Sequence, residues 1–432
     1  MPESSAAAVD RPTDQEAGFL ILHRLLPDVG MANVFWVFEC AESFRTEDFQ
    51  TCLTWLVRRH PRLRTYFPTE AGEPARRTLG PDAVRVTVEQ LDAPEDPTEA
   101  ARRFGARPID ITSGMPVAAA VIHGSDRTSP LVVLVIHHVA VDADATGVLL
   151  DELDTCFRSV TSGAVPPSEV VQPPSTREVV APSEDSVDFW RETLDGVDSR
   201  AMMLDVQRDL EPRTFAAQTL YHQASAEATA SARALCASLG MTRNMVLMTA
   251  FYALMSAHRA GPDLTIGTLV RWQDEADEGP SVDHRTSTLA LRIRADPACG
   301  FRELAGEVAQ GLFEGLVHAD VPFEQVVPAL RTVQGGWRVP VFRQVFNYLP
   351  VGTDLAPGSG PLLSFGRWLP MGKNLIRYEL EFNISDRPDT MLFSTVYSTE
   401  LFDEPAVVEL MRRFERILIA ANRNPDVTLS EL

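Results

Sequence analysis

A short apolar run that ends in two histidines most constrains the fold of this chain. The six residues from Leu131 to Ile136 are all apolar and mostly β-branched. A run this short and this apolar is typical of a strand buried on both faces. After His137 and His138, Asp142 is suited to cap a helix, and apolar side chains then recur at helical spacing. The segment is therefore expected to form a strand, a loop and a helix.

His137 and His138 are adjacent on this strand, which limits what they can do together. Successive side chains of a strand point to opposite faces, so the two imidazoles cannot serve one cavity if the strand continues through them. One is then expected to act and the other to support it. The pattern leaves open a plainer interpretation, in which His138 is a hydrogen-bonded core histidine and Asp142 is only a helix cap.

Length, charge and cysteine usage narrow the class of protein. A chain of 432 residues with 45% hydrophobic residues predicts two domains or two large subdomains. The formal net charge of −21 argues against binding to nucleic acid or to anionic membranes. The five cysteines are scattered and form neither a CxxC pair nor a cluster with zinc spacing, which indicates a reducing compartment.

The N-terminal residues bear on localisation. Residues 1–14 have neither the basic nor the apolar region of a secretory signal, and no stretch of about 18 apolar residues could span a bilayer. We therefore expect a cytoplasmic protein that begins with a disordered tail over residues 1–14.

Residues 161–186 are rich in proline and serine, lack periodicity, and are interpreted as the connection between two halves. Strand and helix patterns mix on both sides, so each half is expected to be a sandwich of helices and a sheet. The expected strands are 33–40, 115–124, 131–136, 264–270, 287–294, 341–348, 378–384 and 392–398. The expected helices are 47–67, running into a strand, then 186–195, 227–258 with a break at Gly240, 301–316 and 404–422.

Several familiar catalytic motifs are missing from the sequence. It contains no GxGxxG, P-loop, GxSxG or HExxH, which disfavours dinucleotide binding, nucleotide hydrolysis, serine hydrolysis and zinc proteolysis by those devices. The histidine pair is also a poor metal site, because adjacent strand side chains diverge. No bound metal is expected.

The segment from His137 to Ala143, HHVAVDA, closely resembles the HHxxxDG motif of the condensation domains of nonribosomal peptide synthetases. Six further segments resemble that family in the same order and at suitable distances: RRHPRLRTYF (58–67), DFWRETLDG (188–196), IGTLV (266–270), HADVPFEQVVPAL (318–330), PVFRQVFNYL (340–349) and YELEFNIS (378–385). The ordered set covers residues 15–432 and is far more specific than any one motif. The chain is similar to a free-standing member of the family.

Three positions depart from the family's pattern. Ala143 stands where the motif has glycine, and Ser287 stands where the family has an asparagine near the following strand. The arginine expected after the glycine-bearing strand is also absent, since Gln273 occupies that position and Arg271 lies two residues earlier. The two imidazoles of the motif are intact.

The resemblance implies a mixed α/β (α+β) fold of two chloramphenicol-acetyltransferase-like subdomains, arranged as a V-shaped pseudo-dimer with an active-site tunnel between them. The N-terminal subdomain would span residues 15–175 and carry the histidine motif, and the C-terminal one would span residues 176–432. It also implies acyl transfer in nonribosomal peptide, antibiotic or other secondary-metabolite biosynthesis. At His138, on the tunnel floor, a carrier-bound acyl or aminoacyl thioester would meet an amine or alcohol and give an amide or ester.

His138 is the expected catalytic residue of this site. Near neutral pH an imidazole can take a proton from an attacking amine or alcohol, or hold that nucleophile in place. The attack creates an oxyanion, and the backbone N–H of Ala143, at the start of the helix after Asp142, is a suitable donor to it.

The other motif residues are expected to support His138. We expect Asp142 to hold the loop, with Arg271 as its cationic partner, and His137 to bond a backbone group. Asn347 and Ser287 are candidates for the tunnel lining, and an asparagine that only ends a strand fits Asn347 equally well.

The resemblance also bears on partners. The chain carries no adenylation or carrier segment, so it is expected to act in trans on the phosphopantetheine arm of a separate carrier protein and to bind no cofactor itself. Arg64 is expected to be structural. Docking of an acidic carrier protein would need a local basic patch, and two clusters are candidates: Arg58, Arg59 and Arg62, and Arg412, Arg413 and Arg416. A solvated helix face is the favoured interpretation of either cluster taken alone.

Three other functions remain open. A coenzyme A-dependent O-acyltransferase of the same superfamily uses the same HxxxD core, and trials with amine and alcohol acceptors would separate the two. A catalytically silent relative would instead recruit a tailoring enzyme to a carrier-bound intermediate. Such relatives generally lose the second histidine of the motif, which is present here as His138. Epimerisation comes last, since the glutamate-centred segment of epimerase relatives is absent.

Overall fold

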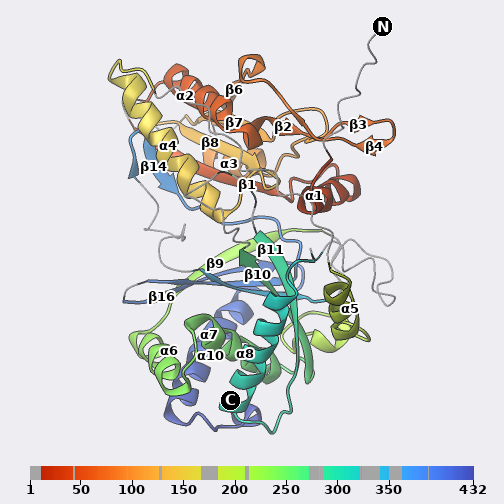
Figure 1. Ribbon diagram of the computed structural model, residues 1–432. Coiled ribbons are helices and arrows are strands. Elements are labelled where there is room, and N and C mark those ends of the chain that lie inside the picture. Colours follow the sequence, from red (N-terminus) through yellow and green to blue (C-terminus); the bar gives the residue numbers. More distant parts are fainter. Residues whose placement is uncertain are drawn as a thin grey trace. The chain divides into compact units, whose positions relative to one another are not determined.

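Two compact units make up the structure, a computed structural model (Figure 1). The first unit comprises residues 1–180, 273–285 and 359–371, and the second comprises 181–272, 286–358 and 372–432. The residues that the structure describes are 11–41, 44–94, 96–125, 129–166, 183–209, 214–271, 282, 284, 286–321, 323, 341–349, 362–387 and 389–432.

The first unit is built on a six-stranded sheet with the order β13-β14-β1-β8-β7-β6. β6 runs parallel to β7, and the other neighbouring strands are antiparallel. The seven residues of β8, inside the sheet, are all buried, which confirms the strand expected from its apolar sequence. The strands are β1 (Asn33–Cys40), β6 (Val88–Asp92), β7 (Val117–His123), β8 (Leu131–His137), β13 (Leu362–Leu363) and β14 (Gly366–Leu369).

Among the described residues, the α-helices of this unit are α1 (Asp14–Leu25), α2 (Thr46–Arg59), α3 (Pro97–Gly105) and α4 (Ala143–Thr161). α3 packs Ala101 and Phe104 against Val133 and Val135 of β8, which buries one face of the sheet. α2 packs against α4. Short elements fill the connections of the unit: η1 (Pro61–Arg64), β2 (Thr65–Tyr66), β3 (Thr69–Glu70), β4 (Glu73–Pro74), β5 (Arg77–Thr78) and η2 (Pro81–Ala83).

The second unit has its own six-stranded sheet, with the order β11-β10-β12-β15-β16-β9. β12 runs parallel to β15 over six residue pairs, but it pairs with β10 only at Gly267 and Val345. The strands are β9 (Ala217–Gln223), β10 (Asp263–Arg271), β11 (Thr286–Arg294), β12 (Gln344–Leu349), β15 (Leu380–Asp386) and β16 (Met391–Ser398).

Helices cover one face of this second sheet (Figure 1). Phe251, Phe382 and Phe414 are among the buried side chains that join them to the strands. The predicted break at Gly240 is confirmed, because this glycine ends α6 in the left-handed region, at φ +67°. The described helices of the unit are α5 (Glu184–Thr193), η3 (Ser199–Met202), α6 (Ala226–Leu239), α7 (Arg243–Ala257), α8 (Phe301–Val317), α10 (Glu404–Arg423) and η4 (Leu429–Glu431).

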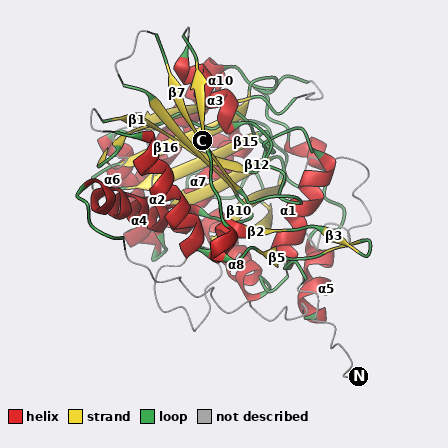
Figure 2. Ribbon diagram, turned by 90° about the horizontal axis from the view of Figure 1, so that it is seen from above, coloured by secondary structure: helices red, strands yellow, loops and turns green. Residues whose placement is uncertain are grey.

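Helices and strands mix in both units, which confirms the predicted mixed α/β class (Figure 2). Among the described residues, no helix is long and apolar enough to cross a membrane. The predicted tail over residues 1–14 extends too far. Residues 1–10 lie outside the described residues, but Thr13 caps α1 by accepting a hydrogen bond from the Glu16 N–H, and Asp14 begins the helix.

The predicted division into 15–175 and 176–432 assigned all later residues to the second subdomain, whereas two strands from the later half belong to the sheet of the first unit. β14 pairs with β1 from Leu369 opposite Val37 to Gly366 opposite Cys40, and it brings β13 with it. Such pairing joins segments far apart in the sequence, and a boundary placed in a linker does not reveal it. Of the predicted linker 161–186, residues 167–182 lie outside the described residues.

Candidate active site

The two histidines stand where β8 gives way to a turn. The His137 N–H donates to the carbonyl of Pro116 at 2.8 Å, and the His138 N–H donates to the carbonyl of Ala32 at 2.7 Å. Backbone bonds therefore hold both residues in place from two different segments. Phe19 of α1 contacts both imidazoles, with ring centroids 5.6 Å from His137 and 6.0 Å from His138. One side chain can contact both rings because β8 ends at His137, so the strand's alternation of faces does not continue through His138.

His137 has the environment of a supporting residue. It is 5% exposed, and its Nδ1 accepts a hydrogen bond from the Val139 N–H at 3.1 Å. The bond to a backbone group is the one expected from the sequence, and it puts the proton of the neutral ring on Nε2. Burial, followed by the nearby His138 and His23, lowers the pKa of His137 to about 3. His137 is therefore neutral at pH 7.

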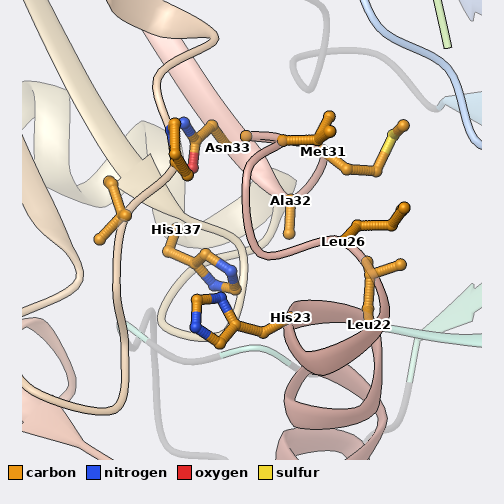
Figure 3. A pocket seen from close by; sticks show the side chains of 11 residues that line it. Leu22, His23, Leu26, Met31, Ala32, Asn33 and His137 are labelled. Carbon is orange, nitrogen blue, oxygen red and sulfur yellow. The ribbon is translucent and has the colours of Figure 1, made fainter. Parts of the chain in front are cut away.

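His137 also lines a small pocket of the first unit. Leu22, Leu26 and Met31 are among its lining residues, and His23 from α1 points its ring toward His137 (Figure 3). His23 in turn lies 3.4 Å from a carboxylate oxygen of Asp110. In the part of the chain that the structure describes, no group of three or more His, Cys, Asp and Glu side chains is placed to hold a metal ion.

His138 is held in a single tautomer. Its Nδ1 lies 2.6 Å from the carbonyl oxygen of Val141, and its ring is partly exposed. A carbonyl oxygen can only accept a hydrogen bond, so Nδ1 carries the proton and the neutral ring has its lone pair on Nε2. An Nε2 lone pair is what a general base needs.

Asp142 organises the backbone that follows. It is the N-cap of α4, and its Oδ1 accepts a hydrogen bond from the Ala145 N–H at 3.0 Å. Its carbonyl oxygen accepts from the N–H and the hydroxyl of Thr146, at 3.1 and 2.9 Å. The side chain is 4% exposed. These contacts support the expected role of holding the loop, whereas the side chain of Arg271 lies outside the described residues and its pairing with Asp142 stays a prediction.

Ala143 is the first residue of α4, where the motif of the family has glycine. The described non-glycine residues with positive φ are Ala71 and Arg259, so the backbone at position 143 does not require glycine. No carbonyl within the helix can accept the N–H of a first helical residue, and the helix dipole adds positive potential there. The N–H of Ala143 is thus suited to the predicted oxyanion role, which stays a prediction.

A third imidazole, which no sequence pattern had indicated, lies beside His138. The ring of His284 is 4.9 Å from that of His138, centroid to centroid, and 5.1 Å from that of Phe19. Burial, followed by His138, Arg62 and His137, lowers the pKa of His284 well below its usual 6.5. His284 belongs to no motif and Phe19 looks like any apolar residue of an amphipathic helix, so no signal in the sequence singles out either one.

A family model described as "Condensation domain" matches residues 14–432. The chain belongs to the condensation-domain family. Phosphinothricin tripeptide synthetase PhsC of Streptomyces viridochromogenes is 26% identical over 429 residues, which cover 95% of this chain and 39% of the relative. Tyrocidine synthase 3 of Brevibacillus parabrevis is 25% identical over 392 residues, which cover 89% of this chain and 6% of the relative. This condensation domain therefore spans less than half the length of these relatives.

Solved structures agree with this membership at the level of fold. The X-domain from teicoplanin biosynthesis has a TM-score of 0.82 at 22% identity, with 100% of this chain and 98% of that chain covered. The same X-domain has been solved in a complex with OxyB. The first condensation domain of the calcium-dependent antibiotic synthetase has a TM-score of 0.73 at 16% identity, covering 98% of this chain and 99% of that chain. The predicted chloramphenicol-acetyltransferase-like fold is thereby confirmed, while the tunnel stays a prediction.

Asn347 and Ser287 both lie in the sheet of the second unit of this condensation domain. Asn347 is 3% exposed, donates from Nδ2 to Oδ1 of Asn383 at 2.8 Å, and accepts from the Leu269 N–H at 3.1 Å. It therefore bridges β10 and β12 beyond the one point at which these strands pair. Ser287, 6% exposed, lies opposite Val270 in the β10–β11 ladder. These contacts give Asn347 a structural task, and a role of either residue toward substrate stays a prediction.

Arg64 has the structural surroundings expected of it. It is 6% exposed, its Nη1 donates to the carbonyl of Leu79, and its own carbonyl accepts from the Leu79 N–H at 3.0 Å. Burial lowers the pKa of its guanidinium. Of the neighbouring arginines, Arg59 pairs with Glu152 at 3.0 Å and Arg62 pairs with Glu16. Both ion pairs lie within the first unit, so the positive charges of Arg59 and Arg62 are partly neutralised by neighbouring carboxylates. The candidate docking patch of Arg58, Arg59 and Arg62 is therefore weaker than its sequence indicates.

Proposed function

We propose that this condensation domain transfers an acyl or aminoacyl group from a carrier-bound thioester to an amine or alcohol. The observation that carries the proposal is the tautomer of His138. Its Nδ1–H is committed to the carbonyl of Val141, so the neutral ring has its lone pair on Nε2, the form that a general base requires.

The proposed reaction uses the motif residues in distinct roles. The nitrogen or oxygen of the acceptor attacks the thioester carbonyl and its proton passes to Nε2 of His138. The carbonyl oxygen becomes an oxyanion, to which the Ala143 N–H is a suitable donor. The C–S bond then breaks, and the proton on Nε2 goes to the leaving thiolate. Asp142 and His137 act only by holding the turn in shape.

The donor in this proposal is the phosphopantetheine thioester of a separate carrier protein. The condensation-domain family match and the similarity to synthetases of peptide antibiotics support this class of donor. Biosynthesis of a peptide or another secondary metabolite is the setting that follows. The chain itself would bind no cofactor.

A second candidate is a silent scaffold that recruits a tailoring enzyme to a carrier-bound intermediate. The observation that favours it is the likeness in fold to the teicoplanin X-domain, which has been solved with OxyB. The presence of His138 in a base-competent tautomer weighs against it, because a scaffold needs no proton acceptor at this position. A coenzyme A-dependent O-acyltransferase would keep the same imidazole and differs only in its donor.

Intact mass spectrometry separates the three functions. Acyl-loaded carrier proteins and the matching coenzyme A thioesters are incubated with the protein and with a panel of amines and alcohols. Loss of the acyl group from the carrier, with a product of matching mass, supports the proposal and distinguishes amide from ester. Transfer from coenzyme A alone supports the O-acyltransferase, and carrier binding with no transfer to any acceptor supports the scaffold.

Two variants make this assay specific for the histidine motif. His138→Ala removes the proposed base. His123→Ala removes an exposed histidine at the end of β7, whose Nε2 lies 2.9 Å from Oε1 of Gln90, and it serves as the matched control. Transfer that is lost in the first variant and kept in the second supports the assignment of His138.

A further inference from the structure

We infer that His284 is a positioning residue that holds the ring of His138 in its reactive orientation, an inference that rests on the proposed function. The bond from Nδ1 to the carbonyl of Val141 fixes one edge of the His138 ring. Aromatic rings packed against the imidazole set its orientation further.

Aromatic neighbours supply those side contacts from two different segments. Phe19 of α1 is stacked on His138 at 24° between the ring planes, and His284 meets it edge-on, at 63°. Phe19 also meets the His284 ring at 79°, so the three rings pack on one another. The His138 ring is thus contacted at Nδ1 by the Val141 carbonyl and elsewhere by two neighbouring rings.

The position of His284 in the chain and its neutral state at pH 7 both suit this task. Within residues 273–285 the structure describes only His284 and Val282, and Val282 is 4% exposed. Its pKa lies well below its usual value, so it stays neutral at pH 7 and adds no repulsive charge when His138 takes up a proton. A cation such as lysine or arginine at this place would oppose that step.

Histidine-selective NMR on the full chain tests the inference without reference to activity. The ring nitrogens of ¹⁵N-histidine report the tautomer of His138 directly. The wild-type protein is expected to show the Nδ1–H form of His138. His284→Ala is expected to yield a mixture of tautomers, and His284→Phe, which keeps an aromatic edge, is expected to restore the single form. The exposed His123→Ala variant should leave the His138 signals unchanged.

Kinetics on the same variants supply the second readout. In acyl transfer, His284→Ala is expected to lower kcat about tenfold with little change in KM, and His284→Phe to recover most of the loss. An unchanged His138 tautomer together with an unchanged kcat in a folded His284→Ala protein would overturn the inference. Phe19→Leu, which removes the stacked ring from another element, gives an independent check if His284→Ala does not fold. If the wild-type protein transfers no acyl group, the proposed function fails, and the NMR result alone still decides the inference.

Discussion

The Nδ1 atom of His138 lies 2.6 Å from the carbonyl oxygen of Val141, three residues further along the chain. This contact sets the tautomer of the imidazole and depends on the turn that Asp142 closes, since Asp142 caps the helix that follows directly. Reactivity at His138 and the backbone geometry of residues 138–145 are therefore coupled. Variants of the helix cap Asp142, of the first helical residue Ala143 and of the buried His137 measure separately what each contributes to activity and to stability.

Replacement of Asp142 by alanine removes the cap of α4 and is expected to lower the free energy of unfolding by about 1 kcal/mol. Asp142→Asn keeps a capping oxygen and should retain most of the stability and activity. Urea unfolding measures the first effect and acyl transfer the second. Asp96→Ala, which removes the cap of α3, is the matched control: it should cost a similar free energy and leave activity unchanged. Equal damage from the asparagine and alanine variants would instead favour an ion pair as the main role of Asp142.

Replacement of Ala143 by proline removes the backbone N–H at this position and leaves the side chains of the site unchanged, so it tests the contribution of that N–H alone. Proline is tolerated as the first residue of a helix, because no carbonyl in the helix uses its N–H. Asp142 already has the extended backbone, φ −118° and ψ −168°, that a following proline requires. Ala143→Pro is therefore expected to fold and to lower kcat by about 10²-fold or more, the usual effect of losing one oxyanion donor.

Ala143→Gly is the control for that variant, since glycine keeps the N–H. Its kcat should stay within about threefold of the wild type, because the backbone at position 143 does not need positive φ. A proline variant that is folded and fully active would eliminate the N–H of Ala143 from the mechanism.

Acidification is expected to destabilise the protein through His137. In the unfolded chain a histidine takes up a proton below about pH 6.5, whereas the pKa of folded His137 is lowered to about 3. Between these values the unfolded state binds more protons, so stability is complete above pH 6.5 and is lost as the pH falls toward 3. The loss is about 1.4 kcal/mol per pH unit for one such group, and His284 acts in the same direction.

Urea midpoints measured from pH 8 to pH 5 test this dependence. His137→Gln has no titrating group at the position, so its unfolding free energy should fall less steeply below pH 6.5 than that of the wild type. His123→Ala should follow the wild-type curve. Identical slopes for His137→Gln and the wild type would show that His137 is not held neutral by burial.

Asn347 is expected to stabilise the second unit through its bridge to β10 and β15. Asn347→Ala leaves the Leu269 N–H and the Asn383 amide without this partner, at a cost of about 1–3 kcal/mol. A double-mutant cycle with Asn383→Ala should give a coupling energy of at least about 0.5 kcal/mol. As an exposed control, Asn422→Ala in α10 should not lower the stability, because alanine is the better helix former. Additive effects of Asn347→Ala and Asn383→Ala would contradict the bridge.

Local features of the fold could be predicted from the sequence because their causes are local. The apolar run of β8, the cap at Asp142 and the break at Gly240 each follow from a few neighbouring residues, and each is present in the structure. The capping box formed by Thr13 and Glu16 is equally local. It was not predicted, because Thr13 had been assigned to the disordered tail.

Features that depend on tertiary contacts could not be predicted in this way. His284 and Phe19 reach His138 from distant segments, and neither residue type nor spacing marks them. β14 joins the sheet of the first unit from the far end of the chain. Asn347 matched a family position, yet the strand separation that it bridges is visible only once β10 and β12 are placed.

The most direct test of the account is the single-turnover rate of acyl transfer from a loaded carrier protein, measured for the wild type, His138→Ala and His123→Ala. The account predicts that His138→Ala slows transfer by about 10²–10⁴-fold, the range usual for a lost general base, while the protein stays folded and still binds the carrier. His123→Ala should match the wild type. Full turnover by a folded His138→Ala protein would contradict the assignment of His138 as the base.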